Sequence, residues 1–151
     1  TVHTLRINGT DVAASEGETI LDVARENGIP IPTMCHLDGL SDTGSCRLCV
    51  VRIAGSPKLT PACTTLAVEG MEVTTVDDEL TAYRRTITQM MFLERNHVCA
   101  VCVADNHCEL QDLAGRGPIG MDPLPFHVRH EDIGPIGTQW REWMQRVAST
   151  G

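Results

Sequence analysis

The chain has 151 residues, of which 42% are hydrophobic and only 3% aromatic, and its formal net charge is -8 at pH 7. This length suits one ordinary domain or two small modules, and the scarcity of aromatic side chains predicts a small core of aliphatic residues and methionine. The acidic balance excludes a nucleic-acid surface, because such surfaces neutralise phosphates with lysine and arginine.

The first third of the sequence predicts a hairpin followed by a helix. Residues 3–7 alternate like a strand, the dipeptide at residues 8–9 is Asn-Gly, and a second strand is expected over residues 11–13. Gly28 is suited to end a helix that covers residues 18–27. The apolar side chains at helical spacing are Ile20, Leu21, Val23 and Ala24.

Two further strands are expected after a loop. The loop, residues 35–45, is rich in glycine, serine and aspartate. Strands are expected at residues 49–53 and 71–76. Together with the hairpin, they predict a mixed sheet crossed by one helix.

A second helix is expected over residues 78–95. Asp77 or Asp78 is placed to cap its start. The apolar stripe of this helix is Leu80, Ile87, Met90, Met91 and Leu93. We interpret Met90 and Met91 as core residues without a redox role.

The last part of the chain predicts little regular structure. Five glycines and four prolines lie between Gly115 and Gly137, which is typical of a linker or an extended arm. Thr138 is placed to cap a short amphipathic helix. Its apolar face consists of Trp140, Trp143, Met144 and Val147. This face is expected to dock on another subunit, or alternatively to pack back on the first domain.

The seven cysteines are the main chemical signal. The first residues have no apolar core of a secretory signal, and no stretch approaches the roughly 20 apolar residues of a membrane span. We therefore expect a cytoplasmic protein. In a reducing compartment, clustered cysteines are metal ligands more often than disulfide partners, and the odd number favours the same interpretation.

The first cysteine group consists of Cys35, Cys46, Cys49 and Cys63, with ten, two and thirteen residues between them. A [2Fe-2S] cluster takes four thiolates from a loop and an adjacent element, and backbone N–H groups donate to its sulfides. Small residues at Gly39, Gly44 and Ser45 would allow that close approach. One alternative is a zinc site, but a zinc knuckle normally has a second tight pair besides one such as Cys46 and Cys49. The other alternative is that these are core cysteines without a metal.

Two other residues adjoin these ligand positions. Arg47 lies between two of the cysteines, where it either tunes the cluster by its charge or is a solvated loop residue. His36, next to Cys35, is either a surface residue or a hydrogen-bond donor near the cluster. The sequence leaves both alternatives open.

The order of hairpin, helix, cysteine loop and strands resembles the β-grasp [2Fe-2S] ferredoxins. Plant-type ferredoxins separate the first two ligands by four residues, whereas ten residues separate Cys35 from Cys46. The run Pro-Thr-Met-Cys-His at residues 32–36 and the run Gly-Ser-Cys-Arg-Leu-Cys at residues 44–49 are similar to a known variant. That variant is found in the large iron–sulfur subunit of respiratory complex I, in iron-only hydrogenases and in the diaphorase iron–sulfur subunit of NAD-reducing hydrogenases.

The second cysteine group is Cys99, Cys102 and Cys108, which leaves a [4Fe-4S] cluster one protein ligand short. A histidine is expected to complete the set, and His97 and His107 are the candidates. Because His107 adjoins Cys108 and neighbouring residues tend to point apart, His97 is favoured.

Residues 94–102 and 108–113 resemble the [4Fe-4S] module that follows the [2Fe-2S] domain in the same proteins and uses one histidine and three cysteines. A single residue separates His97 from Cys99, and this short spacing is most similar to the diaphorase subunit of NAD-reducing hydrogenases. Proteins of this family usually continue with C-x2-C-x2-C-x3-C-P runs for further clusters, but no cysteine follows Cys108 here. The resemblance therefore implies a shortened form with two clusters.

The resemblance implies an α+β fold in three parts. A β-grasp [2Fe-2S] ferredoxin domain is expected over residues 1–77, and a small helical [4Fe-4S] module with one histidine and three cysteine ligands over residues 78–114. A loop-rich arm with a short C-terminal amphipathic helix is expected over residues 115–151. All seven cysteines are then cluster ligands.

The implied function is that of an electron-transfer subunit that is not catalytic on its own. The sequence has no phosphate loop, no dinucleotide-binding motif after a strand and no catalytic triad. The resemblance implies a hetero-oligomer in which single electrons pass between an FMN- and NAD(H)-binding flavoprotein subunit and a catalytic subunit. A nickel–iron hydrogenase is the expected catalytic subunit, and an NAD-dependent formate dehydrogenase is the alternative. An alternative of another class is a zinc-stabilised interaction module without redox activity.

Overall fold

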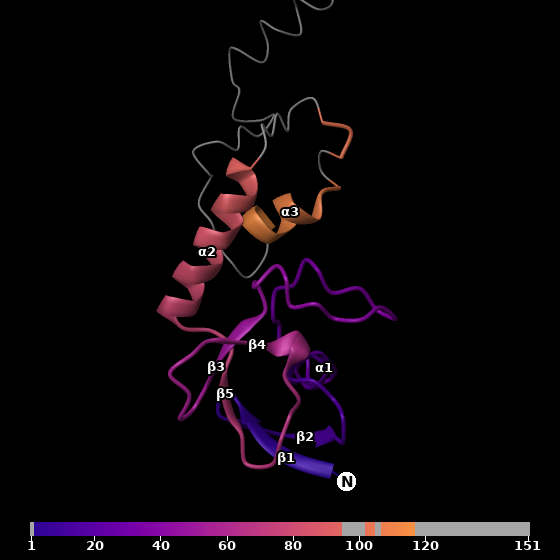
Figure 1. Ribbon diagram of the computed structural model, residues 1–151, viewed down its shortest axis with the longest axis vertical. Helices are drawn as coiled ribbons and strands as arrows, with labels where there is room; N and C mark the ends of the chain where they lie inside the picture. The colour runs from indigo at the N-terminus through magenta and orange to yellow at the C-terminus, as the bar shows by residue number, and fades with distance from the viewer. Residues whose placement is uncertain (1, 95–101, 105–106, 117–151) are drawn as a thin grey trace, which may run out of the picture.

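The computed structural model of the chain describes residues 2–94, 102–104 and 107–116 (Figure 1). It contains a mixed five-stranded sheet with one helix packed on it, and a second helix that leads from the sheet towards the second cysteine group. The α+β class expected from the sequence is confirmed. Within the described ranges, no helix combines the length and the apolar character needed to cross a lipid bilayer.

The sheet begins with a hairpin of β1 (Val2–Ile7) and β2 (Thr10–Ser15). Apolar side chains on one face of both strands are buried, because successive residues of a strand point to opposite faces. Asn8 and Gly9 have φ values of 52° and 83°, the left-handed conformation that a tight hairpin turn of type I′ requires. The predicted hairpin is confirmed, and its second strand is longer than residues 11–13.

Helix α1 (Ile20–Glu26) begins with a reciprocal capping box. The Asp22 N–H donates to Thr19 Oγ1 at 3.2 Å, and the Thr19 N–H donates to the Asp22 carboxylate at 3.0 Å. The buried face of the helix is the predicted one and consists of Ile20, Leu21, Val23 and Ala24. It packs on the inner face of the sheet and forms the first core with side chains of β1, β2 and β5.

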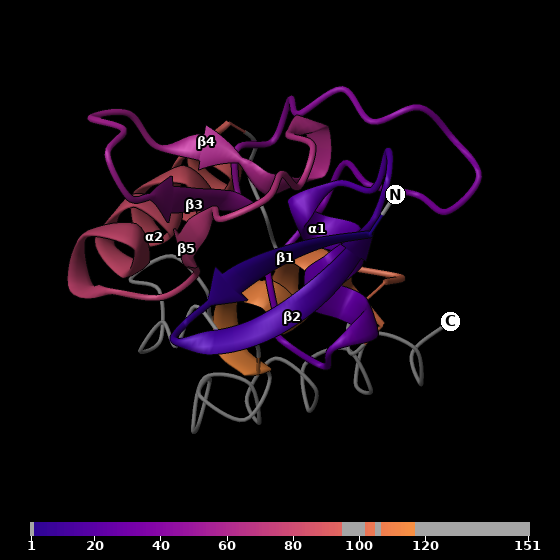
Figure 2. The ribbon, with the colours of Figure 1, turned by 90° about the horizontal axis from the view of Figure 1, so that it is seen from below.

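Three more strands complete the sheet in the order β2-β1-β5-β3-β4 (Figure 2). Strand β5 (Glu72–Thr74) pairs in parallel with β1 and antiparallel with β3 (Val50–Ile53), and both lie within the predicted ranges. On the other edge of β3 lies β4 (Thr60–Pro61), which the sequence did not predict. One turn of 3-10 helix, η1 (Ala62–Thr64), follows β4 and carries Cys63.

Helix α2 (Asp78–Leu93) confirms the predicted second helix. Leu80 is fully buried, and Ile87 and Met91 pack against the second core. Met90, however, is 61% exposed, so its interpretation as a core residue is wrong. Adjacent helical positions differ by about 100° around the axis, and here Met91 takes the inward direction.

Asp77, rather than Asp78, caps α2 and also binds the sheet. One oxygen of the Asp77 carboxylate accepts from the Leu80 N–H at 2.7 Å, and the other accepts from Arg52 Nε at 3.1 Å. The Leu80 N–H holds the pKa of the Asp77 carboxyl below its ordinary value against the opposing effect of burial, and the Arg52 guanidinium lowers it further.

Replacing Asp77 by alanine is expected to lower the stability of the holoprotein by about 1 kcal/mol, the usual value of an N-cap side chain. Because the native pKa lies below the unfolded value of about 3.9, this stabilisation is complete above that value and is lost as the pH falls through the lower native pKa. The decrease in melting temperature should therefore be equal at pH 7 and at about pH 5.5, both above this range. Asp78→Ala serves as the control because Asp78 does not cap the helix. The assignment of Asp77 as the cap of α2 would be contradicted if the decrease in melting temperature were markedly smaller at about pH 5.5 than at pH 7. It would also be contradicted if Asp78→Ala caused the same decrease.

A second core lies between α2 and the end of the described chain. Helix α3 (Glu109–Gln111) continues into one turn of π-helix, η3 (Asp112–Arg116). The buried members of this core are Leu48, Phe92, Leu113 and Ala114. Leu48 belongs to the first predicted domain and the others to the predicted [4Fe-4S] module, so the two parts share a core. The boundaries drawn after residues 77 and 114 stay predictions.

The predicted C-terminal arm is described only at its start, where residues 115 and 116 belong to η3. Residues 117–151 lie outside the described part of the chain. The Gly/Pro-rich segment after residue 116 and the helix predicted to carry Trp140, Trp143, Met144 and Val147 therefore stay predictions.

Candidate metal centres

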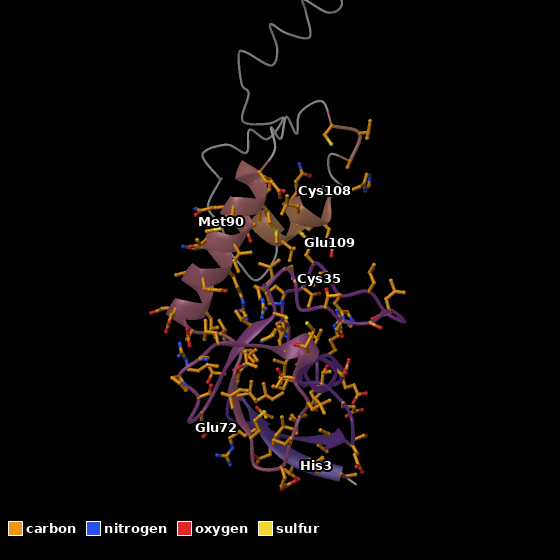
Figure 3. All side chains as sticks on the ribbon, in the orientation of Figure 1. His3, Cys35, Glu72, Met90, Cys108 and Glu109 are labelled. Atoms are coloured by element: carbon orange, nitrogen blue, oxygen red, sulfur yellow. The ribbon has the colours of Figure 1, made fainter. Side chains whose placement is uncertain are left out.

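The first cysteine group gathers at the end of the sheet that faces α3. Figure 3 shows Cys35 at this end, below Cys108 and Glu109 of the second module. Cys46 and Cys49 lie where the long loop enters β3. The Ala62 N–H donates to the Cys49 carbonyl at 3.1 Å, and this bond brings η1, with Cys63, next to the same strand.

The four thiols form two pairs. The Sγ atoms of Cys49 and Cys63 are 3.4 Å apart, and both residues are buried. The Cys46 N–H donates to Cys35 Sγ at 3.5 Å, and these two residues are partly exposed. All four cysteines are free thiols in the structure. Their role as ligands stays a prediction, and the structure brings the four cysteines together as two pairs.

The arrangement in pairs fits a binuclear cluster better than a single metal ion. In the described ranges, no three His, Cys, Asp or Glu side chains are grouped closely enough to hold one ion. A single zinc ion requires four ligands around one centre, whereas a [2Fe-2S] cluster places two protein ligands on each iron. Two thiolates on one tetrahedral metal are about 3.7 Å apart for bonds of roughly 2.3 Å. The 3.4 Å between Cys49 and Cys63 is close to that separation.

The environments of the two pairs differ electrostatically. Burial, followed by the neighbouring Cys49 thiol, raises the pKa of the Cys63 thiol to about 12. Partial burial alone would raise the pKa of Cys35, but hydrogen bonds from Cys46 and from the Ser45 N–H together lower it. Because thiolates bind the metal, the buried pair requires positive charge in the site, which iron itself supplies in part.

The loop over residues 35–45 approaches η1 closely at Gly44. This glycine is buried with φ of 61°, and a Cβ there would lie 3.3 Å from Cγ2 of Thr64. A side chain is therefore disfavoured both by the left-handed backbone and by the lack of space. This contact is with η1, so the close approach of the backbone to a cluster at Gly39, Gly44 and Ser45 stays a prediction; a Cβ at Gly39 would meet nothing within 4 Å.

His36 fastens the same loop. Its ring nitrogens lie 2.6 Å from a carboxylate oxygen of Asp42 and 3.1 Å from one of Asp38, and its side chain is only 9% exposed. Asp38 also binds Arg25 of α1 at 3.2 Å. His36 is thus a loop-fixing residue rather than a solvated one, and the sequence alone did not distinguish these possibilities.

The two residues between Cys46 and Cys49 point in different directions. Arg47 is exposed with φ of 58°, which agrees with the solvated alternative for this side chain. Leu48 is fully buried in the second core, where Met34 and Leu110 pack against it. The segment between Cys46 and Cys49 is therefore anchored in the second core by Leu48.

The second cysteine group is described only in part. His97 and Cys99 lie outside the described residues. Cys102 is exposed, and Cys108 is half-buried at the start of α3. His107 is exposed, and its N–H donates to the Ala104 carbonyl at 3.0 Å in a turn. The choice of His97 over His107 as the fourth ligand therefore stays a prediction.

One residue near the first group was missed by the sequence reasoning. Arg84 of α2 is only 4% exposed, and its guanidinium donates to the carbonyls of Leu48 and Val50, on either side of Cys49. The signal that could have found it is its spacing. Arg84 follows Leu80 by four positions and therefore lies within the apolar stripe of the helix.

Two family models match the chain. Residues 2–78 match the model described as "2Fe-2S iron-sulfur cluster binding domain". Residues 84–119 match the model described as "NADH-ubiquinone oxidoreductase-G iron-sulfur binding region". The two matches cover both cysteine groups in the expected order.

Several curated proteins are similar in sequence. The gamma subunit of the NAD-reducing hydrogenase HoxS from Cupriavidus necator is 37% identical over 122 residues, which cover 81% of this chain and 51% of that protein. The alpha subunit of an NADPH-Fe(3+) oxidoreductase from Geobacter sulfurreducens is 40% identical over 72% of this chain and 13% of its own length. The chain thus spans about half the length of the first relative and a small part of the second.

A solved structure with a similar fold is the crystal structure of an NAD+-reducing [NiFe]-hydrogenase in the H2-reduced state. It matches with a TM-score of 0.73 and 32% sequence identity. The match covers 84% of this chain and 54% of the matched one. Both comparisons therefore point to the class of protein that the cysteine spacing indicated.

Proposed function

Because this chain belongs to the family of 2Fe-2S iron–sulfur cluster-binding domains, with an NADH-ubiquinone oxidoreductase-G iron–sulfur region after it, we propose that it is an electron-transfer subunit. It relays single electrons through one [2Fe-2S] and one [4Fe-4S] cluster between an NAD(H)-linked flavoprotein subunit and a catalytic subunit. The observation that carries the proposal is the arrangement of four cysteines in two pairs, Cys35 with Cys46 and Cys49 with Cys63, next to the second module.

The ligand assignment follows from the pairs and the family. Cys35 with Cys46, and Cys49 with Cys63, would each hold one iron of the [2Fe-2S] cluster. Cys99, Cys102, Cys108 and His97 are the proposed ligands of the [4Fe-4S] cluster. When bound, both clusters supply reversible one-electron redox chemistry without making or breaking bonds to a substrate.

The protein's own contribution is to position the clusters and limit their contact with water. Cys49 and Cys63 are buried in the first core, whereas Cys35 and Cys46 are partly exposed. Cys46 and Leu48 pack against the second core together with Leu110, which lies two residues beyond Cys108. The segments that carry Cys46 and Cys108 are thus joined by packed side chains, and such an arrangement would favour a fixed separation between electron carriers.

The partner proposal rests on the relatives. One relative is a subunit of an NAD-reducing hydrogenase, and the solved structure is an NAD+-reducing [NiFe]-hydrogenase. We therefore infer a hetero-oligomer with an FMN- and NAD(H)-binding flavoprotein subunit and a nickel–iron hydrogenase subunit. The same role in an NAD-dependent formate dehydrogenase is the alternative. Co-purified complex that reduces NAD+ with dihydrogen supports the hydrogenase, and reduction with formate supports the alternative.

The test of the electron-transfer proposal is the cofactor content of anaerobically purified protein. We expect about six irons and about six sulfides per chain, the sum for the two cluster types, and two distinct EPR signals after reduction with dithionite. NADH should reduce both clusters only when the flavoprotein subunit is present. A colourless protein that contains zinc would contradict the proposal and support the interaction module.

A further inference from the structure

Arg84 is a buried cation next to the backbone that carries Cys49. Its Nε donates to the Leu48 carbonyl at 3.0 Å, and one terminal nitrogen donates to the Val50 carbonyl at 2.7 Å. The side chain comes from α2, whereas both acceptors belong to the ligand-bearing segment of the first domain. Arg84 therefore links the second helix directly to the residues on either side of Cys49.

Within the described residues, the charge of Arg84 is not balanced by an ion pair with a carboxylate. In the described part of the chain, no carboxylate forms a salt bridge with it. Asp77 contributes at longer range, but its carboxylate already binds Arg52 and the Leu80 N–H. Burial lowers the pKa of Arg84, and Cys49 and Asp77 oppose that effect.

A buried charge without an ionic partner is strongly destabilising unless another group compensates for it. The carbonyls of Leu48 and Val50 supply partial negative charge only. An oxidised [2Fe-2S] cluster with four thiolates carries net negative charge, and one-electron reduction adds another unit. A cation fixed in a poorly solvated site stabilises the reduced form more than the oxidised form.

We propose that Arg84 is a positioning residue that orients the Cys49 segment from α2 and, through its buried charge, raises the reduction potential of the [2Fe-2S] cluster. This inference rests on the proposed function, because it requires that Cys49 is a ligand of that cluster. It also assigns α2 a role in both modules. The helix leads to the second cysteine group and at the same time sets the electrostatics of the first.

The test separates the charge of Arg84 from its hydrogen bonds. Arg84→Gln keeps a donor but removes the charge, and Arg84→Lys keeps the charge. Arg85→Gln is the matched control, because it removes the same charge from an exposed position one residue further along α2. The potential of the [2Fe-2S] cluster is measured by EPR-monitored redox titration of the whole holoprotein, with dithionite as the reductant.

In Arg84→Gln the equilibrium constant for reduction is expected to fall at least tenfold, which corresponds to a shift of about 59 mV towards negative potential. Arg84→Lys and Arg85→Gln are expected to shift the reduction potential by less than half of that amount. A loaded Arg84→Gln variant with an unchanged potential overturns the inference, as does an equal shift in Arg85→Gln.

If Arg84→Gln does not retain the [2Fe-2S] cluster, Arg84→Lys decides. A retained cluster with a potential close to that of the wild type supports the role of the charge. Loss of the [2Fe-2S] cluster in Arg84→Lys, or a tenfold change in the equilibrium constant for reduction of that cluster, overturns the proposed role of the charge. If the wild-type protein itself shows no [2Fe-2S] signal, the proposed function fails, and this outcome is distinct from a failure of the Arg84 variants alone.

Discussion

Replacing Cys63 by alanine is expected to abolish the [2Fe-2S] cluster and to leave the [4Fe-4S] cluster in place. Cys63 lies 3.4 Å from Cys49. In the proposed ligand assignment, its removal would leave one iron of the binuclear cluster with a single protein thiolate. The iron content of anaerobically purified protein should fall from about six to about four per chain. The EPR signal of the reduced [2Fe-2S] cluster should disappear.

The reciprocal variant is the control for this experiment. Cys108→Ala also removes one thiol, but Cys108 lies at the start of α3 in the second module. It should cause loss of the [4Fe-4S] signal, while the [2Fe-2S] signal remains. Retention of the [2Fe-2S] signal in Cys63→Ala would contradict the assignment. So would loss of both signals in each variant when circular dichroism shows that the chain is still folded, because the two groups would then not be separate sites.

Replacing Leu48 by alanine is expected to lower the free energy of unfolding by about 2–5 kcal/mol, the usual range for a leucine in a core. Leu48 is fully buried and belongs to the core of Phe92, Leu113 and Ala114. Because it also lies between two proposed ligands of the first cluster, its truncation should loosen both modules together. Anaerobic urea denaturation, followed by far-UV circular dichroism and by cluster absorbance, measures the effect.

Leu40 supplies the matched control for Leu48. It lies in the same cysteine loop but is 68% exposed, so Leu40→Ala should change the stability by no more than about 0.5 kcal/mol. Equal effects of the two substitutions would contradict the shared core. Selective bleaching of the [2Fe-2S] cluster in Leu48→Ala, with the [4Fe-4S] signal as resistant as in the wild type, would show that the packing does not couple the modules.

Local features of the fold were predictable because they depend on neighbouring residues. The Asn-Gly turn, the spacing of apolar residues in α1 and the cap of α2 each involve contacts within about four positions. Strand β4 was not predictable in this way. It has two residues, one of them Pro61 without an N–H, and it is positioned by its pairing with β3 and by the bond from Ala62 to the Cys49 carbonyl.

The pattern of cysteines was sufficient to predict the chemistry of the protein. The number and spacing of the cysteines indicated two iron–sulfur clusters, and the family models agree, because ligand type and loop length restrict which inorganic group a chain can hold.

The support of the sites depends on contacts that form only in the folded chain. The arrangement of the thiols in two pairs, the burial of Leu48 in the second module and the position of Arg84 beside Cys49 all join segments far apart in the chain. Such contacts arise from the pairing of β5 between β1 and β3 and from the packing of α2 against β3. Residue periodicity specifies which face of an element is apolar, but not which distant segment will cover it.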